Sequence, residues 1–189
     1  MSFTKLPSYL SPVGTARSLW LLIPDTKFSP EGNYSVKLSF TGNDATELAS
    51  FLDSKLDESV AEAQSKNVGK KITKADPQYS WNDNGTLSVN FKMKASGTTK
   101  DGKQWTRKPP IFNADLSTYE GITEIPVGSK LVVSYTPAIF YTQLTGAGVS
   151  MRLEAVQVVT LGHLNTYGFI DRSISNDYVQ RVAEELEQH

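Results

Sequence analysis

Two stretches of strictly alternating apolar and polar residues place the strongest constraint on how this 189-residue chain can fold. In YSVKLSF (34–40) and TLSVNFKMKA (86–95), every second residue is apolar, which is the pattern of a strand with one buried face. Three further apolar runs predict strands at 14–22, 129–141 and 148–161. The chain is therefore expected to be mainly β.

One segment has the periodicity of a helix instead. Between residues 44 and 65, Ala, Leu and Val recur every three or four positions, which predicts a helix with one apolar face. Asp44 and Glu47 have the spacing of a capping box at its start. The polar, turn-rich segment 66–85 is expected to form a long surface loop. A second helix is predicted to begin at about residue 175.

Five main strands, one of them bulged, suit a small, partly open barrel of the OB-fold type. The bulge is expected after Leu153, where the apolar pattern of the last strand shifts by one residue. A β-sandwich is the main alternative. In the OB-fold interpretation, residues 1–170 form one domain with an inserted helix at 44–65 and a projecting basic β-ribbon at 96–110, and residues 171–189 form an acidic C-terminal helix.

Positive charge is concentrated in the middle of a chain whose formal net charge is −1. Residues 66–108 contain ten Lys and Arg but only three acidic residues. The pair Asp101-Gly102 is typical of a type I′ turn, so the most basic part, 96–110, is predicted to be a hairpin. Two interpretations stay open at this point. Either the lysines are ordinary solvated surface residues, or they form a binding surface for a polyanion.

Two kinds of side chain suggest what such a polyanion would be. Lys92 and Lys94 share the polar face of the 86–95 strand, about 7 Å apart along it, which is close to the phosphate spacing of an extended single strand. Phe140 and Tyr141 are neighbours at a strand end, so they point in opposite directions and at least one should leave the core. Cations along a backbone path and flat side chains for stacking are what binding of single-stranded nucleic acid requires. The candidate phosphate contacts are Lys92, Lys94, Lys100, Lys103, Arg107 and Lys108, and the candidate stacking residues are Phe140, Tyr141 and Trp105.

The residues that most catalytic or metal-binding sites need are scarce. The chain has no Cys and two His, His163 and His189, and it contains no P-loop, G-x-S-x-G or H-E-x-x-H motif. We therefore expect no enzyme activity, no catalytic residue, no metal site and no cofactor. No apolar run reaches the roughly 18 residues of a membrane span, and the N-terminus lacks the pattern of a signal peptide, so a soluble intracellular protein is expected.

Three blocks of sequence, in order, resemble a known family. VGTARSLWLLIPDTKFSPEGNYSVKLSF (13–40), TLSVNFKMKAS (86–96) and VGSKLVVSYTPAIFYTQLTGAGVSMRLEAVQVVTL (127–161) are similar to the single-stranded DNA-binding proteins of tailed bacteriophages, of the podoviral replication type and its relatives. The resemblance implies an OB-fold and binding of single-stranded DNA without sequence preference. It also implies a role in phage DNA replication, recombination and repair in the cytoplasm of the bacterial host.

The resemblance also implies site residues and partners. Matched by position, it places two DNA-contacting lysines at Lys92 and Lys94 and an aromatic contact at Phe140, with Tyr141 beside it. Members of the family commonly end in a long acidic tail that recruits the phage DNA polymerase or primase-helicase, whereas this chain ends EELEQH. Those partners, and a homodimer that depends on that region, stay open. Two other functions for the same barrel stay open as well: a peptide- or oligosaccharide-binding module, and a structural phage assembly protein.

Overall fold

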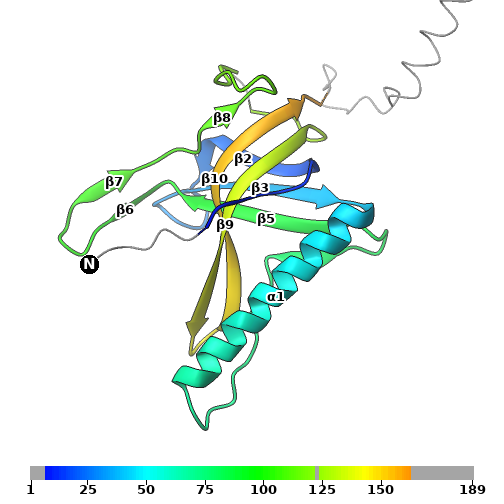
Figure 1. Ribbon diagram of the computed structural model, residues 1–189. Helices are drawn as coiled ribbons and strands as arrows, with labels where there is room; N and C mark the ends of the chain where they lie inside the picture. The colour runs from blue at the N-terminus through cyan, green and yellow to red at the C-terminus, as the bar shows by residue number, and fades with distance from the viewer. Residues whose placement is uncertain (1–6, 122–123, 163–189) are drawn as a thin grey trace, which may run out of the picture.

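Five strands form a closed ring in the computed structural model, which describes residues 7–121 and 124–162 (Figure 1). Their order around the ring is β2, β3, β5, β10, β9 and back to β2, with the β5–β10 contact parallel and the others antiparallel. A closed five-stranded ring is the OB-fold barrel that the sequence predicts, and it rules out the β-sandwich. The ring strands are β2 (Gly14–Asp25), β3 (Asn33–Phe40), β5 (Leu87–Lys94), β9 (Lys130–Thr142) and β10 (Gly146–Thr160).

The ring is closed unevenly. β9 and β10 pair along nearly their whole length, and the register shift between Leu153 and Ala155 is the bulge predicted for the last strand. By contrast, β5 and β10 are in register at a single pair of residues, Lys92 and Arg152. The barrel is therefore partly open along the seam between β5 and β10.

The predicted inward faces of the alternating strands make the core. Val36, Leu38, Val89 and Phe91 are each 0% exposed, as their alternation requires. The ring centroid of Phe91 lies 5.0 Å from that of Tyr135 on β9, so the two sides of the barrel meet in an edge-on aromatic contact. Burying each of these large side chains contributes about 1.5–3 kcal/mol to stability. The opposite faces of the same strands are left free for function.

Helix α1 (Gly42–Lys66) confirms the predicted helix, and its apolar stripe, including Leu48, Leu52 and Leu56, is buried. It packs against β5, β9 and β10, and Figure 1 shows it beside the part of β9 and β10 that extends beyond the barrel. The predicted capping box is wrong. The helix begins two residues before Asp44, and its N-cap residue, Thr41, makes no side-chain capping bond. Asp44 lies in the first turn instead, where a carboxylate interacts favourably with the helix dipole.

The basic hairpin is present, but its turn differs from the prediction. β6 (Ser96–Thr98) pairs with β7 (Gln104–Thr106), and the two project from the barrel (Figure 1). A type I′ turn needs positive φ at both central residues. Here Gly102 has φ 79°, whereas Asp101 is not among the residues with positive φ. The turn is a longer loop, closed by a 2.9 Å bond from the Gly102 N–H to the Thr99 carbonyl. Three-residue hairpin loops of this kind need a left-handed residue at the end, and glycine adopts that conformation without strain.

The segment 66–85 was predicted to be a long surface loop, but part of it is a strand. It contains β4 (Tyr79–Trp81), which pairs with β5, and Tyr79 is buried. The Tyr79 hydroxyl donates a 2.6 Å hydrogen bond to Asp53 on α1. Burial, together with that bond, raises the pKa of Tyr79. A three-residue strand is too short to show periodicity in sequence, which is why the prediction missed it.

Two further short strands extend the sheet: β1 (Tyr9–Leu10) pairs with β9, and β8 (Ile111–Phe112) pairs with β10. The predicted C-terminal helix and both histidines fall in 163–189, outside the described residues. Within the described residues, no helix is both long and apolar enough to cross a membrane.

Candidate functional site

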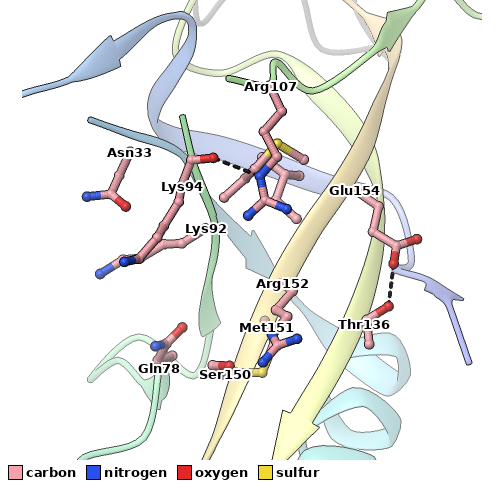
Figure 2. Close-up of a pocket in the computed structure, with 12 residues that line it drawn as sticks. Asn33, Gln78, Lys92, Lys94, Arg107, Thr136, Ser150, Met151, Arg152 and Glu154 are labelled. Atoms are coloured by element: carbon pink, nitrogen blue, oxygen red, sulfur yellow. Dashed lines mark hydrogen bonds between the residues drawn. The ribbon is translucent and has the colours of Figure 1, made fainter. Parts of the chain in front are cut away.

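An open groove with a volume of about 810 Å³ lies over the partly open seam between β5 and β10 (Figure 2). We call it the seam groove. Most of its lining residues come from β5 and β10, and the rest come from β3, β9, the residue before β4 and the segment that leads out of the basic ribbon. Four cationic side chains and one acidic side chain line it: Lys92, Lys94, Arg107, Arg152 and Glu154.

Lys92 and Arg152 form the centre of the groove. They are Cα partners in the parallel register of β5 and β10, so their side chains leave the same face of the sheet. Neither forms an ion pair with another described residue. Two uncompensated cations held side by side create a positive potential that a bound anion would relieve.

The acidic side chain lies away from this centre. Glu154 accepts hydrogen bonds from Thr136 on β9 and, at 2.6 Å, from Ser8 near the N-terminus. Figure 2 shows its carboxylate on the far side of β10 from Lys92 and Lys94. The cationic wall on β5 is therefore not neutralised by Glu154.

Lys94 has a more compensated charge than Lys92. Its ammonium group lies 3.1 Å from a carboxylate oxygen of Glu31, and both side chains are largely exposed. An exposed ion pair of this kind contributes at most about 1 kcal/mol. The ammonium group can therefore exchange Glu31 for a phosphate at little cost.

Arg107 brings the base of the ribbon into the groove. Its Nε donates a 2.8 Å hydrogen bond to the Lys94 carbonyl (Figure 2), and its backbone N–H donates one of 2.8 Å to the Ala95 carbonyl. Loss of solvation, and to a lesser degree the charge of Arg152, lowers the pKa of Arg107. A guanidinium nevertheless stays protonated in proteins, so the repulsion between the two arginines favours an anion between them.

The Trp105 ring is partly buried against its own ribbon, and the residue also lines an open cavity of about 390 Å³. A Cβ atom on Gly97, its cross-strand partner, would lie 2.6 Å from the indole, so the ring rests directly on the glycine backbone. The guanidinium carbon of Arg107 lies 5.1 Å from the centre of the same ring, in the range of a cation–π contact. These two contacts favour a role in positioning Arg107 over direct stacking on a base.

The other ribbon cations are separate from the groove. Lys100 and Lys103 flank the tip of the hairpin, and Lys108 follows Arg107; all three are exposed, and none lines the seam groove. Of the predicted phosphate contacts, the structure thus brings together Lys92, Lys94 and Arg107. The remaining three lie along a path that leads away from them.

The two neighbouring aromatic residues are on opposite faces of β9. Phe140 is in register with Gly148, and Thr136, four residues earlier on the same face of β9, is in register with Arg152. Phe140 therefore points from the same face of β9 as Thr136, which lines the seam groove, and its ring lies across Gly148, where a Cβ would be 2.6 Å away. Tyr141 points from the other face. Neither aromatic residue lines the seam groove itself, and both border a separate cavity of about 430 Å³ against α1.

Sequence reasoning missed Arg152. A signal was present, because Arg152 lies between Met151 and Leu153, two residues predicted to face inward. Alternation therefore turns Arg152 outward. The local apolar pattern does not show that β10 lies beside β5, since that register joins residues sixty positions apart. Among the described residues, no group of three His, Cys, Asp or Glu side chains could hold a metal ion.

Known structures share this fold. No protein-family model matches the sequence, and neither does any curated protein. The structure is similar to gp2.5, a single-stranded DNA-binding protein encoded by bacteriophage T7, with a TM-score of 0.75 and 22% identity over 94% of each chain. It is also similar to the single-stranded DNA-binding protein from bacteriophage Enc34 in complex with single-stranded DNA, with a TM-score of 0.60 and 12% identity over 81% of this chain and 86% of that one. Another structure of the single-stranded DNA-binding protein from bacteriophage Enc34 gives a TM-score of 0.58 and 13% identity over 92% and 89% of the two chains. At these identities the likeness establishes a shared fold.

Proposed function

We propose that this protein binds single-stranded DNA without sequence preference and coats it during phage DNA replication, recombination and repair. One observation carries the proposal: Lys92 and Arg152 lie side by side over the seam, with Arg107 and Lys94 at its edge. A line of cations in an open groove is suited to a flexible phosphate backbone.

The shape of the seam groove favours a single strand over a duplex. Its cations come from adjacent β-strands, which are about 4.8 Å apart, and from the ribbon base, so they follow an open surface that a flexible single strand can track. In this proposal Lys92, Lys94, Arg107 and Arg152 contact successive phosphates. Lys100, Lys103 and Lys108 add outer contacts along the ribbon, Phe140 stacks on a base, and Trp105 holds Arg107 in place.

The structural neighbours support the same conclusion. Both are phage proteins that bind single-stranded DNA, and one of them has been solved with single-stranded DNA bound. Their barrel is also the barrel of this chain, and the seam groove supplies the charge that such a ligand needs. The proposal therefore joins the shared fold to the chemistry of this chain's own residues.

The biological setting belongs to the proposal as well. A coating protein acts by covering DNA and needs no catalytic group, which fits the scarcity of such groups in the sequence. It would work in the cytoplasm of the infected bacterium, where the phage polymerase and the primase-helicase are its natural partners, as a monomer or a homodimer.

Competition binding tests the proposal. Fluorescence anisotropy of a labelled thirty-nucleotide oligo-dT should show binding that unlabelled mixed-sequence single strands displace as well as unlabelled dT does. A blunt duplex of the same length should displace the label at least tenfold less effectively. Equal displacement by duplex and single strand would overturn the proposal, and so would displacement by only one sequence.

A further inference from the structure

Two large aromatic side chains outside the seam groove are exposed to solvent. Trp20 on β2 is 44% exposed and Phe28, in the loop after β2, is 87% exposed. Aromatic residues of this size usually contribute to a core, and two exposed ones in the same hollow suggest a ligand. Both line a second groove, with a volume of about 490 Å³, on the outer face of β2, β3 and β5.

The register of the sheet connects this second groove to the first. Trp20 is paired with Ser35, Ser35 with Lys92, and Lys92 with Arg152, so one row of side chains crosses four strands. Paired residues point to the same face of a sheet, so the Trp20 indole and the Arg152 guanidinium lie on one surface with Lys92 between them. Asn33 and Lys92 line both grooves.

The residues around the indole leave room for a flat ligand. The neighbouring row of the sheet pairs Ser18 with Lys37 and Lys37 with Asn90, so short polar side chains lie on either side of one cation. Lys37 is exposed, and with Lys92 it gives this groove two cations. A base could lie on Trp20 while its phosphate reaches either lysine.

Phe28 is held at the edge of the same groove. The backbone N–H of Lys27 donates a 2.9 Å hydrogen bond to Asp25, which fixes the turn that carries Phe28. The Lys27 ammonium lies 5.3 Å from the centre of the Phe28 ring, so a cation accompanies the exposed aromatic face. Asp25 is the one acidic side chain among the lining residues of this groove, all of which are described.

We infer that Trp20 and Phe28 form a base-stacking subsite, which extends the DNA path from the seam groove across β5 and β3 to β2. The inference rests on the proposed function, because the same strand would occupy both grooves. Stacking suits a protein that ignores sequence, since every base presents a flat face. Lys92, shared by the two grooves, would contact the phosphate that joins the two parts of the path.

Tryptophan fluorescence tests this subsite. The chain has three Trp, so two matched proteins can each retain one reporter: Trp81→Phe with Trp105→Phe leaves Trp20, and Trp20→Phe with Trp105→Phe leaves Trp81. Trp81 is the control, because it is 51% exposed and lies on β4, away from both grooves. Saturating oligo-dT should quench the emission of the Trp20 protein and leave that of the Trp81 protein unchanged.

The affinity of variants for oligo-dT provides a second test of the same subsite. Trp20→Ala and Phe28→Ala should each weaken binding of oligo-dT by about 5- to 100-fold, the range expected for loss of a stacked base. Trp81→Ala should keep wild-type affinity. If Trp20→Ala fails to fold, Phe28→Ala still decides the matter, since a loop residue that is 87% exposed cannot support the core.

The outcomes separate the two claims. Wild-type protein that binds oligo-dT, with unchanged Trp20 emission and full affinity after Phe28→Ala, would overturn the subsite and leave the proposed function standing. Wild-type protein that does not bind oligo-dT at all would overturn both.

Discussion

Phe91 and Lys92 are neighbours in β5, yet their surroundings are opposite. Phe91 is 0% exposed, with its ring 5.0 Å from that of Tyr135, whereas Lys92 is exposed between two grooves. A shift of one residue in the register of β5 would bury a charge and expose an aromatic ring. Phe91 therefore fixes the direction of Lys92, because burying the Phe91 ring is favourable in one register only.

The same alternation separates the two aromatics of β9 and gives a prediction. Phe140→Ala should weaken binding of oligo-dT by ~1–3 kcal/mol, because Phe140 points from the same face of β9 as Thr136, a lining residue of the seam groove. Tyr141→Ala should leave the affinity unchanged, because Tyr141 points from the opposite face of β9. Anisotropy titrations of the two variants measure both effects. A larger loss for Tyr141→Ala than for Phe140→Ala would show that the DNA runs along the other face of β9.

Among the elements, the basic ribbon has two parts with different surroundings. Its outer cations project into solvent, whereas its last residues are fixed to the barrel by the two hydrogen bonds from Arg107 to Lys94 and Ala95. Trp105 lies between Gly97 and the Arg107 guanidinium. The base of the ribbon is thus the structured part that delivers a charge to the seam groove.

This arrangement predicts that Trp105 acts through Arg107. Arg107→Gln should cost about 1 kcal/mol of binding energy for oligo-dT, as expected for loss of one charged contact. Trp105→Ala should weaken binding in the wild-type background and add little in the Arg107→Gln background, because the residue it positions is already gone. A double-mutant cycle measured by anisotropy gives the coupling. The same penalty in both backgrounds would mean that Trp105 contacts the DNA itself.

The elements with strong local periodicity were predictable from sequence. The strands at 34–40 and 86–95 and the helix at 44–65 repeat their apolar residues over several turns or steps, so their type follows from the local pattern. β4 was missed because it has three residues, and the helix start and the ribbon turn were misassigned because they depend on backbone conformation at single residues such as Gly42 and Gly102.

The site was predictable only in part, for a different reason. Alternation alone places Lys92 and Lys94 on an outward face. It does not show which strands lie beside them. The positions of Arg152 and Trp20, at the two ends of the row through Lys92, were therefore not predicted. Pairing between strands far apart in sequence is decided by closure of the whole barrel.

At the scale of the whole molecule, a formal net charge of −1 hides a strongly uneven distribution. Helix α1, whose sequence contains most of the acidic residues of its region, and the basic β6–β7 ribbon extend from the barrel in different directions (Figure 1). The cations of β5, β10 and the ribbon base converge on one groove. A cationic groove of this kind can raise the local concentration of a polyanion even on a protein whose net charge is close to zero.

The dependence of binding on salt tests this account most directly. Each phosphate contact to a single strand contributes about 0.7 to the slope of log K against log salt concentration. Replacing Lys92 and Arg152 with Gln should therefore weaken binding of oligo-dT and flatten the slope by roughly 1.4. The matched double change Lys55→Gln and Lys130→Gln, at residues that line neither groove, should leave both affinity and slope as in the wild type. An unchanged slope for the Lys92 and Arg152 variant would contradict the account, because the seam groove would then not hold the phosphates.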